Sequence, residues 1–185
     1  MENHKGMMKA FLYENLRDLM VRNVFEKITI KQICDQTGAI RATFYNYFED
    51  KYDCLNAIVY HDLAEDIIKN ISTITMQQAV ENSLRAIDSN REFYRRAYNV
   101  TGQNSFEEMV HRNVTLVVKT YLEKYRTPGF LPKFSNDMIA GYYGQCVAYQ
   151  YKVYVFQKDI PSDPKEYASM IIELMNHTPT DFFSK

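Results

Sequence analysis

The sequence predicts an all-α protein of about nine helices, and two observations carry this prediction. The first is a set of helix-start signals, in which a Ser, Thr or Asp is followed three residues later by Glu or Gln. Each pair can satisfy backbone N–H groups that the first helical turn leaves without partners. The second is that apolar residues recur at three- and four-residue steps after these signals. The signals are Thr29–Gln32, Thr75–Gln78, Ser89–Glu92, Ser105–Glu108 and Asp163–Glu166.

The apolar periodicity places the long helices in chain order. A first helix is expected from about residue 7 to 23, where Leu12, Leu16 and Met20 share one face. The only clear Pro- and Gly-rich loop, 126–134, separates two helices, and no internal repeat or low-complexity tract is present. Further long helices are expected at about 55–67, 106–125, 136–158 and 164–176.

Composition and charge exclude several classes of protein. With 185 residues, of which 46% are hydrophobic and 24% charged, the chain can bury a sizeable core. A formal net charge of −1 predicts neither a nucleic-acid coat nor a membrane-surface protein, so any electrostatic argument must be local. No stretch approaches the roughly 18 apolar residues of a membrane span. We therefore expect a cytoplasmic protein without a membrane partner.

The sequence offers no constellation for catalysis or metal binding. Cys34, Cys54 and Cys146 are odd in number and widely spaced, which favours reduced thiols over a disulfide framework or a zinc site. The four histidines show no paired spacing, and no Ser/His/Asp arrangement or glycine-rich phosphate loop is present. We expect no enzymatic activity, no metal and no cofactor.

Residues 29 to 55 form the most informative constellation. A short helix should begin after Thr29 and end near Gln36, because Gly38 can adopt the left-handed conformation that terminates a helix. A second short helix should run from Arg41 to Tyr47. Two short helices joined by a tight turn containing Gly are the pattern of a helix-turn-helix, whose second helix enters the DNA major groove.

The side chains of the second short helix divide between two faces. Phe44 is spaced to join Ile33 and Ala39 in a core, whereas Arg41, Ala42, Thr43 and Tyr45 fall toward the opposite face. An Arg can bind guanine O6 and N7, Ala and the Thr methyl can contact a thymine methyl, and a Tyr hydroxyl can reach phosphate.

The stretch from Thr29 to Leu55 resembles the N-terminal DNA-binding domain of the tetracycline-repressor (TetR) family, and the match extends over about residues 7–60. Its most specific parts are Thr29-Ile30, Gly38, Thr43-Phe44-Tyr45, Phe48, Lys51 and Leu55. The resemblance implies a three-helix helix-turn-helix domain at 1–52 and a helical bundle at 53–185 for ligand binding and dimerisation. It also implies a ligand-responsive repressor that binds a palindromic double-stranded DNA operator as a homodimer, with a small-molecule effector.

Carried over residue by residue, the resemblance predicts the DNA-binding surface. Arg41 and Thr43 should face base edges, while Phe44 and Phe48 should pack the three-helix head. Phosphates should be held by Thr29, Tyr45, Tyr47 and Lys51. The complete expected DNA-binding set is Thr29, Lys31, Ile40, Arg41, Ala42, Thr43, Tyr45, Tyr47 and Lys51.

Two features depart from the family pattern. Ile40 occupies a position where the family usually has a small capping residue, and losing such a cap costs about 1 kcal/mol. Ile40 is therefore either a local packing substitute or a direct contact to a thymine methyl. The second departure is charge. Between Val24 and Phe48 there are only three basic residues, Lys27, Lys31 and Arg41, and there are two acidic residues. The stretch therefore offers little positive charge for binding DNA.

Aromatic residues in the C-terminal part predict a ligand pocket, because rings with hydroxyl tips suit a small, partly aromatic molecule. The alternative is that these rings pack a core or an interface. The residues expected to line the pocket are Tyr94, Tyr98, Phe106, Tyr121, Tyr125, Tyr142 and Tyr143.

The last two long helices are expected to form the dimer interface as a four-helix bundle with the second subunit. Gly141 and Gly144 would allow close approach of the helices. The alternative is that these apolar stripes face the subunit's own core. The expected interface residues are Cys146, Tyr149, Val153, Phe156, Tyr167, Ile171 and Leu174.

Residues 141–156 and 162–168 resemble the branch of the family that includes regulators of dihydroxyacetone kinase operons. Some members of that branch act as coactivators through protein contacts. Two alternatives to a ligand-responsive repressor therefore stand. One is a DNA-binding module whose C-terminal domain binds a protein partner, marked by an exposed apolar patch instead of a closed cavity. The other is a helical interaction protein without DNA binding.

Overall fold

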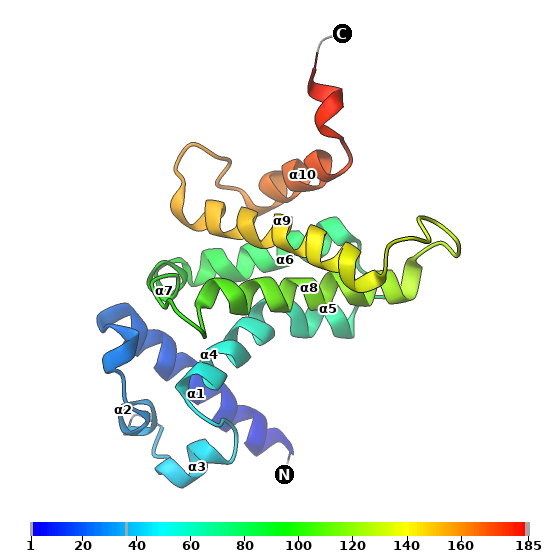
Figure 1. Ribbon diagram of the computed structural model, residues 1–185. Coiled ribbons are helices and arrows are strands. Elements are labelled where there is room, and N and C mark those ends of the chain that lie inside the picture. The colour runs from blue at the N-terminus through cyan, green and yellow to red at the C-terminus, as the bar shows by residue number, and fades with distance from the viewer. Residues whose placement is uncertain (1, 36, 184–185) are drawn as a thin grey trace. The chain divides into compact units, whose positions relative to one another are not determined.

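The computed structural model describes residues 2–35 and 37–183, and all regular structure within them is helical (Figure 1). The π-helical turn His61–Glu65 joins α4 and α5 into one continuous helix, which gives nine helices in the described residues and confirms the all-α prediction. In chain order the helices are α1 (Glu2–Arg22), α2 (Ile30–Asp35), α3 (Arg41–Tyr45), α4 (Lys51–Tyr60), α5 (Asp66–Lys69), α6 (Met76–Ser89), α7 (Arg91–Ala97), α8 (Phe106–Tyr125), α9 (Asn136–Phe156) and α10 (Pro164–Met175).

The chain packs into two compact units. The first holds the residues up to His61 together with Asn90–Val110, and the second holds Asp62–Ser89 and the chain from His111 onward. This division differs from the expected boundary between residues 52 and 53, which falls inside α4. The structural units therefore do not coincide with the expected domains, and the functional division of the chain stays a prediction.

The first unit is built around α1, which packs against α2, α4 and α7. Leu12, Leu16 and Met20 of α1 are fully buried, as the apolar spacing predicted. Phe44 and Phe48 are also buried, and their ring centroids lie 5.3 Å apart. The helix-turn-helix segment therefore shares one apolar core with the first long helix.

Four of the five helix starts that the sequence predicted carry a side-chain capping hydrogen bond. The Thr29 N–H donates to Gln32 Oε1 at 2.8 Å, and the Gln32 N–H donates to Thr29 Oγ1 at 3.3 Å. Side-chain caps also form at Thr75, Ser105 and Asp163. The prediction for Ser89 is wrong, because its hydroxyl donates to the Arg85 carbonyl inside α6 and Asn90 occupies the start of α7.

In the second unit α10 packs along α6, and α6 also contacts α9 (Figure 1). The part of α8 from His111 onward runs antiparallel to α9, because Lys119 pairs with Asp137 at 2.7 Å while Thr115 lies against Gly144. A Cβ at Gly144 would overlap Thr115 Oγ1 and lie 2.9 Å from Thr115 Cα. Gly144 thus allows close packing within the subunit, and not between subunits as we expected.

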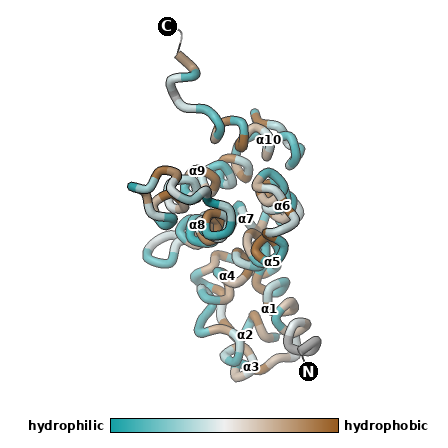
Figure 2. Tube along the Cα trace, turned by 90° about the vertical axis from the view of Figure 1, so that its right-hand side faces the viewer, coloured by the Kyte–Doolittle hydropathy of each residue, from teal (hydrophilic) through white to brown (hydrophobic). Residues whose placement is uncertain are grey.

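No helix within the described residues combines the length and the apolar character that crossing a membrane requires. Hydrophilic and hydrophobic residues are interspersed along the helices (Figure 2).

Candidate nucleic-acid interface

The turn between α2 and α3 has the geometry of a helix-turn-helix. Gly38 adopts φ +68°, the left-handed conformation that a residue with a Cβ rarely adopts. The Thr37 hydroxyl donates to the Cys34 carbonyl at 2.8 Å and accepts from the Ala39 N–H at 3.1 Å. These bonds fix the direction in which the chain leaves α2 and enters α3.

A buried asparagine attaches α2 to α1. Asn15 Nδ2 donates to the Ile33 carbonyl at 3.0 Å, and the Ile33 side chain is fully buried. A buried amide that lost this partner would pay a desolvation penalty of about 1–3 kcal/mol. The bond therefore helps to set the register of α2 on α1.

Most of the expected DNA-binding residues between Ile40 and Tyr45 are exposed. Ile40 is 68% exposed and Tyr45 56% exposed, while Arg41 and Ala42 are also exposed. Thr43 is half-buried. Phe44 turns into the core and Arg41, Ala42 and Tyr45 are exposed, as the sequence predicted, whereas Thr43 is only partly exposed. Base contact itself stays a prediction.

The residues expected to hold phosphate lie in different environments. Tyr45 is exposed, and Tyr47 is half-buried with its ring centroid 6.2 Å from that of Phe48. Thr29 is exposed, but its hydroxyl donates to Gln32 Oε1 at 2.9 Å as part of the α2 cap. Lys31, which belongs to the wider expected DNA-binding set, adds an exposed cation on α2.

Lys51 has a different role from the one predicted. Its ammonium group donates to the carbonyls of Phe25, Glu26 and Ile28 at 2.8, 2.9 and 3.0 Å. The same group lies 4.7 Å from the centre of the Phe25 ring. Burial lowers the pKa of Lys51, and Glu26 and Asp50 act in the opposite direction.

An ammonium group has three N–H donors, and all three are directed at these carbonyls. The prediction that Lys51 holds a phosphate therefore conflicts with the structure. The side chain caps the carboxyl end of the short 3₁₀ turn Phe25–Lys27 and links it to the start of α4. Asp50 caps the same start of α4, accepting from the Asp53 N–H at 2.8 Å.

Three of the expected ligand-binding residues lie in the aromatic core of the first unit. Tyr94 and Phe106 are fully buried, with ring centroids 5.7 Å apart in an edge-to-face arrangement. Tyr98 packs on Phe106 in the same manner at 5.0 Å. Each of these rings packs against another ring, which favours the core role that the sequence left open, and their role in ligand binding stays a prediction.

The other expected ligand-binding residues lie in the second unit. The Tyr121 hydroxyl donates to the Ile74 carbonyl at 2.9 Å, and the Tyr125 hydroxyl donates to the Ile71 carbonyl at 3.1 Å. Tyr142 and Tyr143 line an open, largely apolar groove of about 470 Å³. These tyrosines thus border the surface, and their role in ligand binding stays a prediction.

A small void lies inside the second unit. Its volume is about 10 Å³, and apolar side chains line it together with Ser83 and Tyr151. Burial raises the pKa of Tyr151, while its hydrogen bond with Ser83 acts in the opposite direction. A void of this size holds about one water molecule, whereas pockets for drug-sized ligands measure about 300–1,000 Å³.

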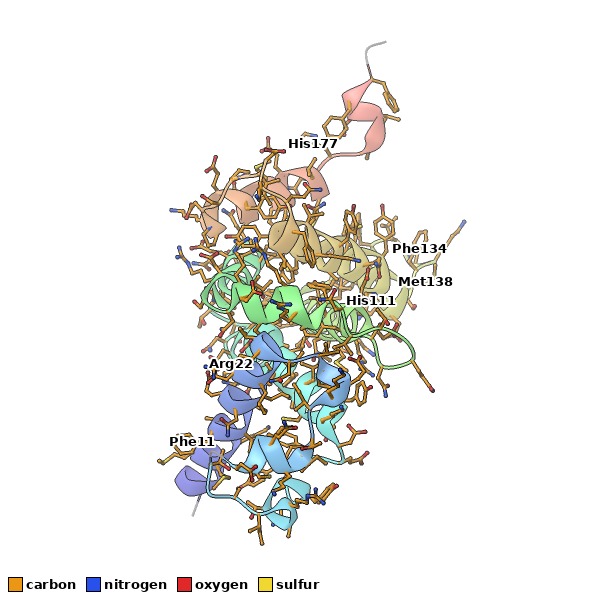
Figure 3. The ribbon with its side chains drawn as sticks, turned by 90° about the vertical axis from the view of Figure 1, so that its left-hand side faces the viewer. Phe11, Arg22, His111, Phe134, Met138 and His177 are labelled. Atoms are coloured by element: carbon orange, nitrogen blue, oxygen red, sulfur yellow. The ribbon has the colours of Figure 1, made fainter. Side chains whose placement is uncertain are left out.

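The loop between α8 and α9 presents an apolar surface that the sequence did not reveal. Arg126 holds the loop by donating to the carbonyls of Phe130, Leu131 and Phe134 at 3.0, 2.9 and 2.8 Å, and to Asn136 Oδ1 at 2.6 Å. Figure 3 shows Phe134 and Met138 at the edge of the molecule. We call Phe130, Leu131, Phe134, Met138 and Tyr142 the loop patch; all five are exposed.

The expected dimer-interface residues divide into two groups. Tyr167 and Ile171 are each 3% exposed, because they lie on the face of α10 that packs into the subunit. The Tyr167 hydroxyl donates to Gln150 Oε1 at 2.7 Å, and burial raises its pKa to about 12. The interface prediction is therefore wrong for these two residues. Of the rest, Val153 is half-buried, and the exposed ones are Cys146, Tyr149, Phe156 and Leu174.

Comparison with protein families identifies the class to which this architecture belongs. A family model described as "Transcriptional regulator C-terminal region", of the TetR type, matches residues 74–177. This match covers more than half of the chain, and the chain belongs to the TetR family of transcriptional regulators. The family is one of regulators and not of enzymes, in agreement with the sequence prediction.

Individual relatives point to one branch of the family. The chain is 33% identical over 94 residues to the HTH-type dhaKLM operon transcriptional activator DhaS of Lactococcus lactis subsp. lactis (strain IL1403). That match covers 51% of this chain and 48% of the relative, so the chain matches about half the length of this curated relative. The branch agrees with the resemblance of residues 141–156.

Two solved structures share the fold. The dihydroxyacetone kinase operon activator DhaS superposes with a TM-score of 0.68 at 20% identity, covering 96% of this chain and 98% of the other. A protein described as a TetR-family transcriptional regulator from Syntrophomonas wolfei str. Goettingen gives 0.62 at 18% identity, covering 92% and 94%. At these identities the likeness shows the fold alone.

The role of Lys51 can be tested by removing its ammonium group while keeping an apolar stem. We expect Lys51→Met to lower the free energy of unfolding in urea by about 1–3 kcal/mol, because three carbonyls lose a charged donor. Lys31→Met is the control, and at this exposed site we expect a change within about 0.5 kcal/mol. Equal stability of the two variants would contradict the capping role.

Proposed function

We propose that the protein is a homodimeric regulator that binds a palindromic double-stranded DNA operator through α2 and α3. The observation that carries this proposal is the two-sided geometry of α3. Phe44 anchors the helix in the core while Arg41, Ala42 and Tyr45 are presented to solvent. Membership of a family of transcriptional regulators supports it.

The proposal of a dimer is supported by α9, which is apolar on both faces. Its inner face is buried through Ala140, Val147 and Tyr151. A helix that is hydrophobic all round is normally buried all round, so the outer face calls for a partner. The outer stripe recurs at three- and four-residue steps: Tyr142, Cys146, Tyr149, Val153 and Phe156.

A second copy of the chain fits this outer stripe best. Leu174, which is exposed on α10, extends the same apolar character. A two-fold axis would bring α9 and α10 of each subunit together in a self-complementary surface. Dimerisation also serves DNA binding, since one recognition helix of five residues contacts few base pairs and a dimer reads two half-sites about 34–36 Å apart or a multiple of that distance.

DNA binding has two candidate effects on transcription, which are repression released by a ligand and activation through a protein partner. Ligand-released repression needs a pocket, and the groove of about 470 Å³ beside Tyr142 and Tyr143 has the size of one, although it is open to solvent. Activation through a protein partner needs an accessible apolar surface instead, and the loop patch offers one. The Lactococcus lactis relative is described as a transcriptional activator. We therefore carry activation through a protein partner as the second candidate.

DNA binding is tested by titrating the protein on the DNA upstream of its own gene and on duplexes selected from a random library. We expect Arg41→Ala to relax preference at one base pair by about 1–3 kcal/mol. We expect Lys31→Met to weaken all sequences alike and to flatten the salt slope by about one unit. Failure to bind any duplex specifically at low or physiological salt would overturn the proposal.

The dimer is tested with Tyr149→Glu combined with Leu174→Glu. Both side chains are exposed in the subunit, so the variant should fold, and two carboxylates in an apolar seam should prevent association. We expect sedimentation velocity to show a monomer that no longer binds DNA specifically. Leu116→Glu, at another exposed apolar position on α8, is the control. A dimer that survives the double change but not Leu116→Glu would place the interface on α8.

The two candidate effects on transcription are separated by Phe134→Asp combined with Met138→Asp in the loop patch. Activation through a protein contact predicts that a reporter fused to the bound promoter loses its activation while DNA affinity and dimerisation are kept. A repressor predicts that the reporter is silenced equally by the wild type and the variant. Leu116→Asp controls for the loss of any exposed apolar side chain.

A further inference from the structure

Ile40 occupies an unusual position for an isoleucine. It is the residue before α3, with φ −93° and ψ 161°, and it makes no side-chain capping hydrogen bond. Its side chain is 68% exposed. A polar residue here would accept a hydrogen bond from a backbone N–H group of the first helical turn. A side chain that is mostly exposed also buries little apolar area and so adds little hydrophobic stabilisation. Within the subunit Ile40 therefore brings neither a cap nor core packing.

The packing role that the sequence left open is thus not supported by the structure. Core packing beside Ile40 is supplied by Phe44, which is fully buried. Ala42, two residues further along, also presents an apolar side chain to solvent. The exposed surface of α3 consequently combines one guanidinium, that of Arg41, with adjoining apolar side chains.

The chemistry of the major groove specifies what such a surface can recognise. Base edges there offer hydrogen-bond donors and acceptors, and the one apolar group is the C5 methyl of thymine. An aliphatic side chain presented to this groove therefore discriminates by contacting that methyl. Serine in the same position would gain a cap and lose this contact.

We infer that Ile40 is a specificity-determining residue that reads a thymine methyl in each half-site, with Ala42 adjoining it. The inference rests on the proposed binding of DNA through α3. It adds the identity of a base to that proposal. It also explains why an apolar residue stands where a helix cap would stabilise the protein.

The experiment uses the full-length protein and a duplex that the wild type selects from a random library. The duplex is made in two forms, with thymine or with uracil at single positions, because uracil lacks only the C5 methyl. Loss of one buried methyl-sized group corresponds to about a four-fold change in an equilibrium constant. We expect the wild type to bind about four-fold more weakly for one critical uracil, and about fifteen-fold for the symmetric pair.

Two variants of Ile40 separate recognition from stability. Ile40→Ser should bind the thymine duplex about as weakly as the wild type binds the uracil duplex, and should show no further loss on uracil. Its melting temperature should rise by several degrees, because serine supplies the missing cap. Ile40→Ala should lose the same discrimination without this rise, so the effect on DNA is not a consequence of altered stability.

Val24→Ser is the matched control. Val24 precedes the 3₁₀ turn with φ −69° and ψ 130°, makes no capping hydrogen bond and is 61% exposed. The Val24→Ser variant should keep the wild-type ratio of affinities for the thymine and uracil duplexes.

The outcomes distinguish this inference from the proposed function. Specific binding with equal affinity for thymine and uracil at every position would overturn the inference and leave the proposed function standing. The inference would also be overturned if the Ile40→Ser variant kept the wild-type ratio of affinities for the thymine and uracil duplexes. Failure to recover any specifically bound duplex would overturn both.

Discussion

The hydrogen bonds of the Lys51 ammonium group are the interaction on which the candidate DNA-binding surface depends. They join the end of the short turn that follows α1 to the first residue of α4, at distances of 2.8 to 3.0 Å. The segment between these two points contains α2 and α3. Both helices are short, six and five residues, and helices of that length are not stable alone. Their position is therefore set by attachments at the ends and by the buried contacts of Asn15, Ile33 and Phe44.

Much of this fold could be predicted from the sequence because its signals are local. The Thr29–Gln32 cap and the left-handed Gly38 depend on residues within a few positions of each other. The role of Lys51 could not be predicted in the same way. Its position in the motif was visible, but its carbonyl partners lie 23 to 26 residues earlier, and a sequence does not show where an ammonium group points. A charge near a DNA-binding motif was therefore assigned to DNA when it serves the fold.

The predicted dimer and ligand residues show a second limit, which arises from helices with apolar residues on two faces. Ile171 and Leu174 are three positions apart on α10, yet Ile171 is buried and Leu174 is exposed. Periodicity identifies both as apolar and cannot say which face meets the subunit's own core. Tyr94 and Phe106 raise the same difficulty, because a ring that packs a core and a ring that lines a pocket have the same sequence signature. Packing partners distant in sequence decide between these roles.

The reassignment of Lys51 changes how DNA affinity must be distributed. The basic surface between Val24 and Phe48 was already thin, with Lys27, Lys31 and Arg41 against two acidic residues. Non-specific affinity for DNA comes mostly from the counterions that are released when Lys and Arg side chains neutralise phosphates. Because the Lys51 donors bind backbone carbonyls, fewer cations are available for this neutralisation. Under the proposed function, specific binding must then draw more heavily on base contacts and on the pairing of two half-sites. The proposed roles of two exposed apolar features meet the same need: the uncapped Ile40 before α3 and the outer face of α9. Under the proposed function, each stabilises the dimer bound to DNA and contributes little to the stability of a single chain.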